Sequence, residues 1–168
     1  MPQINIKARY VDPPPKPILE YKIAVIKNNI VIIIIKKNIM TVNIALLTVT
    51  DTRTIDNDKS GAILVEKIKQ ANHKMVDRKI CKDNKEDIVS ILKVWTNQKD
   101  IDVIITTGGT GLTGRDITPE ALDEIADKHI PGFGEVFRTI SLKTVGTSSI
   151  QSRACAVLSN GKYIFALP

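Results

Sequence analysis

The sequence predicts an α/β domain with a mostly parallel sheet, helices on both faces and an antiparallel hairpin at one edge. From residue 42 onward, short apolar segments alternate with segments of helical periodicity. Such alternation is typical of parallel strands joined by crossover helices. Near the C-terminus, Asn160-Gly161 separates two apolar runs, and this dipeptide is a strong signal for a tight hairpin turn.

The expected strands are short, apolar and followed by polar or turn residues. They cover residues 42–49, 74–80, 101–106, 154–158 and 162–167. In an open parallel sheet, ligands bind beyond the carboxyl ends of the strands. We therefore expect the site to be built from Thr50–Arg53, Cys81–Asn84 and Thr107–Thr118.

The expected helices begin at capping residues and carry apolar side chains at helical spacing. Asn57 or Asp58 is expected to cap the first helix, which reaches about residue 71. The second has apolar residues at i, i+3, i+4 and i+7, from Ile88 to Trp95. Thr118 is expected to cap a third helix, which ends near residue 131, and a fourth covers residues 135–142.

Composition fits an ordinary globular domain, and it excludes several other classes of protein. The chain has 168 residues, of which 43% are hydrophobic and 25% charged, and its longest apolar run is far shorter than the roughly 20 residues that cross a bilayer. We therefore expect a cytoplasmic protein with no membrane contact. Two cysteines and two histidines without zinc spacing exclude a structural zinc site.

The net charge of +6 lies almost wholly in residues 1–40, where seven basic residues face two acidic ones. The remaining chain is nearly neutral, and only 4% of all residues are aromatic, so we expect no nucleic-acid binding. Residues 1–40 also hold the proline-rich segment 12–17 and the apolar run Ile30–Ile35, a candidate strand. We interpret them as an N-terminal extension to a domain that covers residues 41–168.

The glycine-rich segment after the third expected strand is the strongest functional signal. Gly108, Gly109, Gly111 and Gly114 lie within seven residues, among hydroxyl side chains. Such a loop exposes main-chain N–H groups, which bind phosphate oxygens. The segment also meets the dinucleotide pattern G-x-G-x-x-G and the Walker A spacing. However, no helix opens at its last glycine, and Arg115 and Asp116 replace the Walker lysine and hydroxyl residue. We reject both assignments.

Asp116 predicts a metal, because a carboxylate beside a phosphate repels it unless a hard cation lies between them. Magnesium is the simplest candidate, and Asp83 is the natural companion because it follows a neighbouring strand. Asp83 also begins a D-x-x-E pattern, which favours a helix-capping role as well. Arg115 and Arg138 are candidates for neutralising phosphate. Cys81 and Cys155 are expected to be buried thiols rather than nucleophiles.

Four motifs together resemble the molybdenum cofactor biosynthesis family, and the MoaB branch more than the MogA branch. They are Thr-Gly-Gly-Thr-Gly at 107–111, Gly-Arg-Asp-Ile-Thr-Pro-Glu-Ala at 114–121, Pro-Gly-Phe-Gly-Glu at 131–135 and Gly-Thr-Ser-Ser-Ile-Gln-Ser-Arg at 146–153. The resemblance implies a three-layer α/β/α domain that assembles as a homotrimer or homohexamer. Family members continue past the position of Pro168 into a loop and a helix, so we expect this domain to lack both.

The resemblance also implies an activity, a substrate and site residues. Active members attach AMP from Mg-ATP to the phosphate of molybdopterin, which would make this chain a molybdopterin adenylyltransferase. The two functional aspartates of the family fall on Asp83 and Asp116, as catalytic residues and as ligands of Mg²⁺. Residues expected to bind the substrates are Thr107, Gly108, Gly109, Thr110, Gly111, Gly114, Arg115 and Thr118.

Two other functions remain open at this point. One is a non-catalytic oligomer that binds molybdopterin as a scaffold for a partner enzyme of the same pathway. The other is a nicotinamide-dependent oxidoreductase, which requires an acidic residue after the second strand to bind the ribose. No residue in the sequence meets that requirement convincingly.

Overall fold

A computed structural model of the chain describes residues 21–26, 30–35 and 41–168. Two sheets occur in these ranges. Strands β1 (Tyr21–Ile26) and β2 (Ile30–Ile35) form a separate antiparallel pair that lies next to helix α1. The expected strand at Ile30–Ile35 is thus confirmed, whereas the proline-rich segment 12–17 lies outside the described residues.

The main sheet has six strands in the order β4-β3-β5-β8-β7-β6. They are β3 (Asn43–Val49), β4 (Lys74–Cys81), β5 (Val103–Thr107), β6 (Lys128–His129), β7 (Cys155–Ser159) and β8 (Lys162–Leu167). Strands β4, β3, β5 and β8 are mutually parallel, and β7 runs antiparallel to both of its neighbours. The turn between β7 and β8 has positive φ angles at Asn160 and Gly161, as the predicted hairpin requires.

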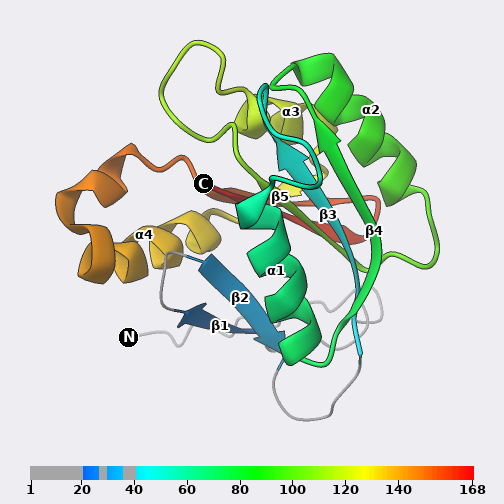
Figure 1. The fold of residues 1–168 in the computed structure, drawn as a ribbon, viewed down its shortest axis with the longest axis horizontal. Coiled ribbons are helices and arrows are strands. Elements are labelled where there is room, and N and C mark those ends of the chain that lie inside the picture. Colours follow the sequence, from blue (N-terminus) through cyan, green and yellow to red (C-terminus); the bar gives the residue numbers. More distant parts are fainter. Residues whose placement is uncertain (1–20, 27–29, 36–40) are drawn as a thin grey trace, which may run out of the picture.

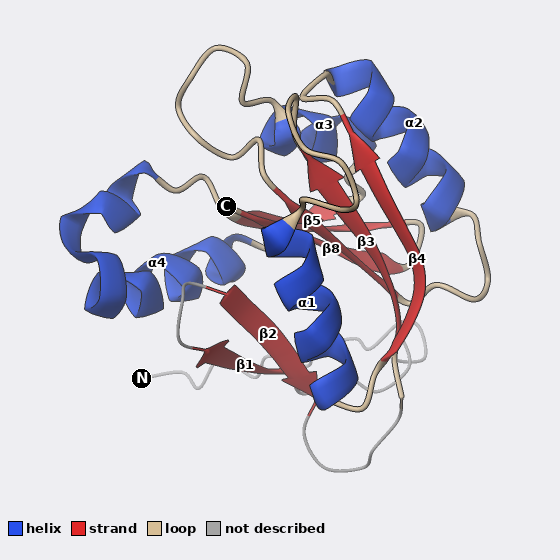
Figure 2. Cartoon of the chain, viewed as in Figure 1, coloured by secondary structure: helices blue, strands red, loops and turns tan. Residues whose placement is uncertain are grey.

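Helices cover both faces of this sheet, which gives the three layers expected (Figure 1, Figure 2). They are α1 (Lys59–Gln70), α2 (Lys85–Thr96), α3 (Thr118–Ile125) and α4 (Pro131–Val145), followed by the 3₁₀ helix η1 (Gly146–Gln151). Helices α1 and α4 pack on one face, where Leu64 and Phe137 enter the core. Helices α2 and α3 pack on the other, where Trp95 and Leu122 are fully buried.

The starts of α2 and α3 differ from the sequence-based expectation. Asp58 caps α1 as expected, but Asn84, not Asp83, caps α2 by accepting a hydrogen bond from the Asp87 amide. Thr118 is the first residue of α3 rather than its cap, and its hydroxyl bonds elsewhere. Asp83 is therefore free of a capping role.

The third expected helix was too long and the fourth too short. Helix α3 ends at Ile125 because the chain turns there to pair with β7, where the Asp127 amide donates to the Leu158 carbonyl over 2.8 Å. Helix α4 begins at Pro131, since proline fits the first turn of a helix, where no amide donor is needed.

The parallel strands end at one edge of the sheet, and their register aligns these ends. Thr48 of β3 pairs with Thr107 of β5, which in turn pairs with Leu167 of β8. Val49 pairs with Cys81 at the end of β4. The loops that follow β3, β4 and β5 therefore meet at this edge. No helix within the described residues is long and apolar enough to span a membrane.

Candidate functional site

The glycine loop after β5 is fixed at its start by close main-chain packing. Gly108 has a φ of 98°, and a β-carbon there would lie 2.2 Å from the carbonyl oxygen of Val49. Only glycine fits both constraints. The Gly108 amide donates to the Leu167 carbonyl over 3.0 Å, and the Thr118 hydroxyl donates to the Gly108 carbonyl over 2.9 Å. The first helical residue of α3 thus holds the loop against the sheet edge.

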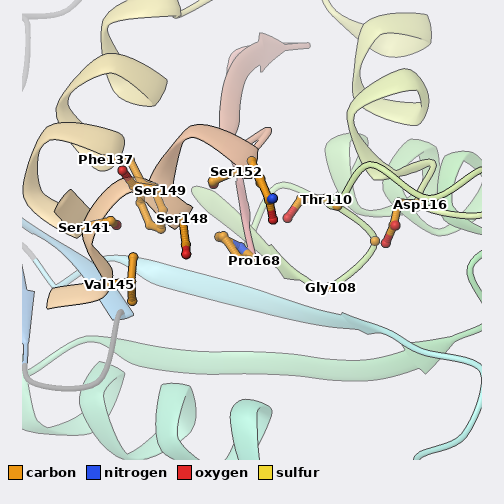
Figure 3. A pocket seen from close by; sticks show the side chains of 13 residues that line it. Gly108, Thr110, Asp116, Phe137, Ser141, Val145, Ser148, Ser149, Ser152 and Pro168 are labelled. Atoms are coloured by element: carbon orange, nitrogen blue, oxygen red, sulfur yellow. The ribbon is translucent and has the colours of Figure 1, made fainter.

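A cavity of about 400 Å³ lies between the glycine loop and the α4–η1 segment (Figure 3). The loop contributes Gly108, Gly109, Thr110, Gly111 and Asp116 to its wall. The opposite wall carries hydroxyl, amide and apolar side chains. These are Phe137, Ser141, Val145, Ser148, Ser149, Gln151 and Ser152, with Pro168 between the two walls. The cavity therefore joins the main chain of the glycine loop on one side to hydrogen-bonding side chains on the other.

Five of the predicted site residues do not line this cavity. Thr107 and Thr118 are buried, and the Thr107 hydroxyl donates to the Pro168 carbonyl over 3.1 Å. Gly114 and Arg115 are exposed at the outer end of the loop. Asp83 is also absent from the cavity wall, although its Oδ1 atom would be 2.8 Å from a β-carbon at Gly109. None of these five residues therefore belongs to the wall of the cavity.

Asp83 lies in a partly buried position with other negative charges around it. Its Oδ1 atom accepts the Ile117 amide over 3.2 Å, and its own amide donates to Asp51 Oδ1 over 3.1 Å. Burial and the nearby charges of Asp116 and Asp51 raise the pKa of the Asp83 carboxyl, against the lowering effect of the Ile117 hydrogen bond. A bound cation would therefore stabilise the ionised form of the Asp83 carboxyl.

Asp116 is held by the loop that contains it. Its carboxylate accepts hydrogen bonds from the Thr113 hydroxyl and, over 2.9 Å, from the Thr113 amide. The Thr113 hydroxyl is the largest cause of the lowered pKa of Asp116, which is therefore ionised at neutral pH. Gly111 makes room for this carboxylate, because a β-carbon there would lie 2.7 Å from Asp116 Oδ2.

The carboxylate oxygens near the loop suit a Mg²⁺ ion that also binds oxygen atoms of a substrate. Asp51, Asp83 and Asp116 come from three different loops and offer only oxygen atoms. No cluster of three or more His, Cys, Asp or Glu residues with metal-site geometry occurs among the residues that the structure describes. Mg²⁺ commonly binds through one or two carboxylates together with substrate phosphates and water, so a complete protein cage is not required.

Two arginines have structural partners that the sequence did not reveal. Arg138, a candidate for neutralising phosphate, donates to the main-chain carbonyls of Ser152 and Ala154 over 3.3 and 3.4 Å. Arg153 binds the glycine loop through the Gly111 and Asp116 carbonyls. The serines of the cavity wall were also not singled out: Ser148, Ser149 and Ser152 had only the 146–153 motif as a signal, and Ser141 lies outside it. Asp51 lies in the expected site segment Thr50–Arg53 but was not named as a site residue on its own.

Comparison with known proteins identifies the family. A family described as "Probable molybdopterin binding domain" matches residues 38–168, which is most of the chain. The chain belongs to the molybdenum cofactor biosynthesis family. Molybdenum cofactor biosynthesis protein B of Bacillus cereus is 44% identical over 124 residues, which are 73% of each chain. The protein of the same name from Escherichia coli K12 is 44% identical over 125 residues, or 74% of each chain.

Solved structures of this family share the fold. A crystal structure of molybdenum cofactor biosynthesis protein B matches with a TM-score of 0.76 and 42% identity, covering 79% of this chain and 83% of the other. The tungsten cofactor synthesizing protein MoaB from Pyrococcus furiosus matches with a TM-score of 0.69 and 34% identity, covering 78% and 84%. A MogA structure has 27% identity and a TM-score of 0.67, covering 75% and 83%. The expected likeness to the MoaB branch is confirmed.

Proposed function

We propose that this protein binds molybdopterin with its phosphate at the glycine loop and transfers AMP from Mg-ATP to that phosphate. One observation carries the proposal: the loop that lines the cavity also lies against two carboxylates. Asp116, which lines the cavity, lies against Gly111, and Asp83, which does not line it, lies against Gly109. A phosphate bound by the loop would then lie next to a Mg²⁺ ion bound by these carboxylates.

The cavity suits a polar, phosphorylated ligand. Main-chain amides of a glycine loop bind phosphate without a positive side chain. The serines and Gln151 on the opposite wall supply donors and acceptors for a heterocycle rich in nitrogen and oxygen. A volume of about 400 Å³ lies within the range of small-molecule sites.

The proposed reaction needs positioning more than proton transfer. An oxygen of the molybdopterin phosphate attacks the α-phosphorus of ATP, and the bond from that phosphorus to the leaving pyrophosphate breaks. A phosphate monoester has a second pKa of about 6, so the nucleophile is already ionised at neutral pH and no general base is required. When bound, Mg²⁺ would offset charge on the phosphates. Asp83 and Asp116 would hold it, while the glycine loop orients the nucleophile.

The test measures pyrophosphate release and formation of adenylylated molybdopterin by the purified protein with Mg-ATP. We expect Asp83→Ala and Asp116→Ala each to abolish product while the circular dichroism spectrum stays native. The matched control is Asp123→Ala, since Asp123 is an exposed carboxylate of α3 that pairs with His129 and does not line the cavity. Unchanged turnover in either site variant would remove that aspartate from the mechanism.

Binding without turnover is the second candidate function, and one observation favours it. Asp83 does not line the cavity, so a ligand could fill that cavity without contacting both carboxylates. The same assay separates the two functions. Molybdopterin retained by the protein with no adenylylated product would support a scaffold role in the pathway.

We also propose that the protein assembles as a homotrimer or homohexamer. Large apolar side chains are exposed along α4 and η1, among them Leu142, at 52%, and Ile150, at 76%. Exposed apolar groups in one segment favour a protein interface. Light scattering should give three or six times the chain mass of 18.6 kDa, and Ile150→Asp should lower that mass. A single-chain mass for the unmodified protein would contradict the proposal.

A further inference from the structure

The guanidinium of Arg153 connects three points around the glycine loop. Its Nε atom donates to the Gly111 carbonyl over 2.7 Å, and its Nη2 atom donates to the Asp116 carbonyl over 2.6 Å. Its Nη1 atom forms an ion pair with Glu120 in the first turn of α3. The Arg153 amide also donates to the Thr110 carbonyl over 3.2 Å.

We propose that Arg153, supported by Glu120, is the positioning residue that sets the Asp116 carboxylate in place for the adenylyl transfer. This inference rests on the proposed function. Arg153 does not line the cavity, so its effect on the reaction is indirect. By binding the carbonyls of Gly111 and Asp116, it fixes both ends of the segment that carries the metal-binding carboxylate.

The geometry requires an arginine. A planar guanidinium can donate to two carbonyls and one carboxylate at once, because its five N–H groups point in fixed directions. A lysine ammonium at this position could not reach the same three partners together. The Arg153 side chain is 29% exposed, so these bonds are partly shielded from water.

Glu120 completes the arrangement by holding the charge of Arg153. Burial acts to raise the pKa of Glu120, but the hydrogen bond and charge of Arg153 outweigh it, and the pKa is lowered. The carboxylate therefore stays ionised at neutral pH. Because Glu120 belongs to α3, the ion pair anchors Arg153 to the helix that follows the loop.

A second arginine fixes the main chain from which Arg153 projects. Arg138 of α4 donates to the carbonyls of Ser152 and Ala154, the two neighbours of Arg153 in the chain. Arg153 thus projects from a segment tied to α4 and holds the loop on the other side of the cavity. This network links the serine-bearing wall to the Asp116 wall.

The test combines hydrogen exchange with kinetics on Arg153→Lys and Glu120→Gln. The matched control is Arg78→Lys, because Arg78 is also an arginine paired with a carboxylate, Asp58, but it belongs to β4 and has no hydrogen bond to the glycine loop among those the structure describes. The readout is exchange of the Thr113 amide, which donates to Asp116 Oδ2. We expect exchange of the Thr113 amide to be at least about tenfold faster in Arg153→Lys and to increase less in Glu120→Gln. In Arg78→Lys, exchange of this amide relative to that of core amides should not change.

In the kinetic arm, Arg153→Lys should lower kcat about 100-fold, as a misplaced catalytic group does, while Arg78→Lys should retain it. Unchanged Thr113 exchange in Arg153→Lys and in Glu120→Gln would overturn the inference. Should Arg153→Lys fail to fold, Glu120→Gln decides the question. If the unmodified protein shows no adenylyl transfer, the proposed function fails, and the exchange data still decide whether Arg153 positions Asp116.

Discussion

The carboxylate of Asp83 lies against Gly109, with its Oδ1 atom 2.8 Å from the position of a β-carbon at that glycine. The same β-carbon would lie 2.4 Å from the Thr118 hydroxyl, and the φ of Gly109 is 64°. Thr118 fixes the loop and Asp83 is a predicted metal ligand. A side chain at Gly109 would therefore collide with both Thr118 and Asp83, so the loop can lie against this carboxylate only because the residue is glycine.

Replacing Gly109 with alanine tests this relationship. We expect Gly109→Ala to lower the free energy of unfolding by about 1 to 3 kcal/mol, from the positive φ and the displaced neighbours, and to abolish molybdopterin binding. Urea denaturation and equilibrium binding measure the two effects. The control is Gly132→Ala in α4, where a β-carbon meets no atom within 4 Å. Native binding by Gly109→Ala would show that the loop tolerates a side chain there.

Asp83→Asn should stabilise the ligand-free protein while it removes activity. The raised pKa means that folding disfavours the ionised carboxyl, through burial first and then the charges of Asp116 and Asp51. The Asp83 carboxyl therefore contributes favourably to the stability of the fold below the ordinary pKa of aspartate. This contribution is lost as pH rises through the raised pKa of the folded protein. At pH 7 we therefore expect Asp83→Asn to be more stable by about 0.5 kcal/mol, with no difference at low pH.

Asp116→Asn is the matched comparison and should act in the opposite direction. The pKa of Asp116 is lowered, chiefly by the Thr113 hydroxyl, so its ionised form favours folding at pH 7. Urea midpoints at pH 7 and pH 3 measure both variants. A gain in stability for Asp116→Asn, or a loss for Asp83→Asn, would refute the charge distribution described for the site.

Asp58 should give the fold an acid-sensitive contribution. It caps α1, accepts the Thr48 hydroxyl over 2.6 Å and pairs with Arg78 over 3.0 Å. Burial acts to raise its pKa, but the hydrogen bonds from Thr48, Gly61 and Arg78 outweigh burial and lower it. A lowered pKa stabilises the fold above the ordinary value near 3.8, and this stability is lost as pH falls through the folded-state pKa.

We expect Asp58→Asn to cost about 2 kcal/mol at pH 7, because it leaves the Arg78 charge without its partner. The cost should be the same at pH 5 and should shrink below about pH 3.8. Denaturant melts at these three values check the trend, with the exposed Asp100→Asn as control. A cost that does not change with pH would mean that Asp58 acts only as a cap.

The two cysteines should react slowly in the native protein. Burial is the main cause of the raised pKa of each thiol, to about 12 for Cys81 and about 11 for Cys155. Because the thiolate is the reactive form, alkylation at pH 8 should be at least about 100-fold slower than for a free cysteine. Mass spectrometry should find both thiols modified quickly in denaturant, and rapid labelling of either in the native protein would contradict the prediction.

Local patterns in the sequence predicted much of the fold because helices and tight turns are set by residues that are close together in the chain. The periodicity from Ile88 to Trp95 corresponds to the buried face of α2, and Asn160-Gly161 forms the predicted hairpin turn. Element ends were less predictable. Asp83 and Asn84 are both good capping residues, and long-range hydrogen bonds from Asp83 to Asp51 and from Ile117 to Asp83 leave the cap to Asn84.

The site itself was predictable only in part. The glycine loop and its two aspartates follow from composition and from their place after strands. The partner of Gly111 is Arg153, 42 residues later, and no local pattern indicates such a contact. The cavity wall on α4 and η1 depends in the same way on the tertiary packing of a helix whose start the sequence placed four residues too late.

The central claim is that main-chain amides of the glycine loop hold the phosphate of molybdopterin. A crystal structure of the protein with molybdopterin and Mg²⁺ tests it most directly. We predict phosphate oxygens at about 3 Å from amide nitrogens of Gly109 and Thr110, with the pterin extending toward the serines of η1. A molybdopterin phosphate bound elsewhere, with no ligand atom touching this loop, would contradict the account.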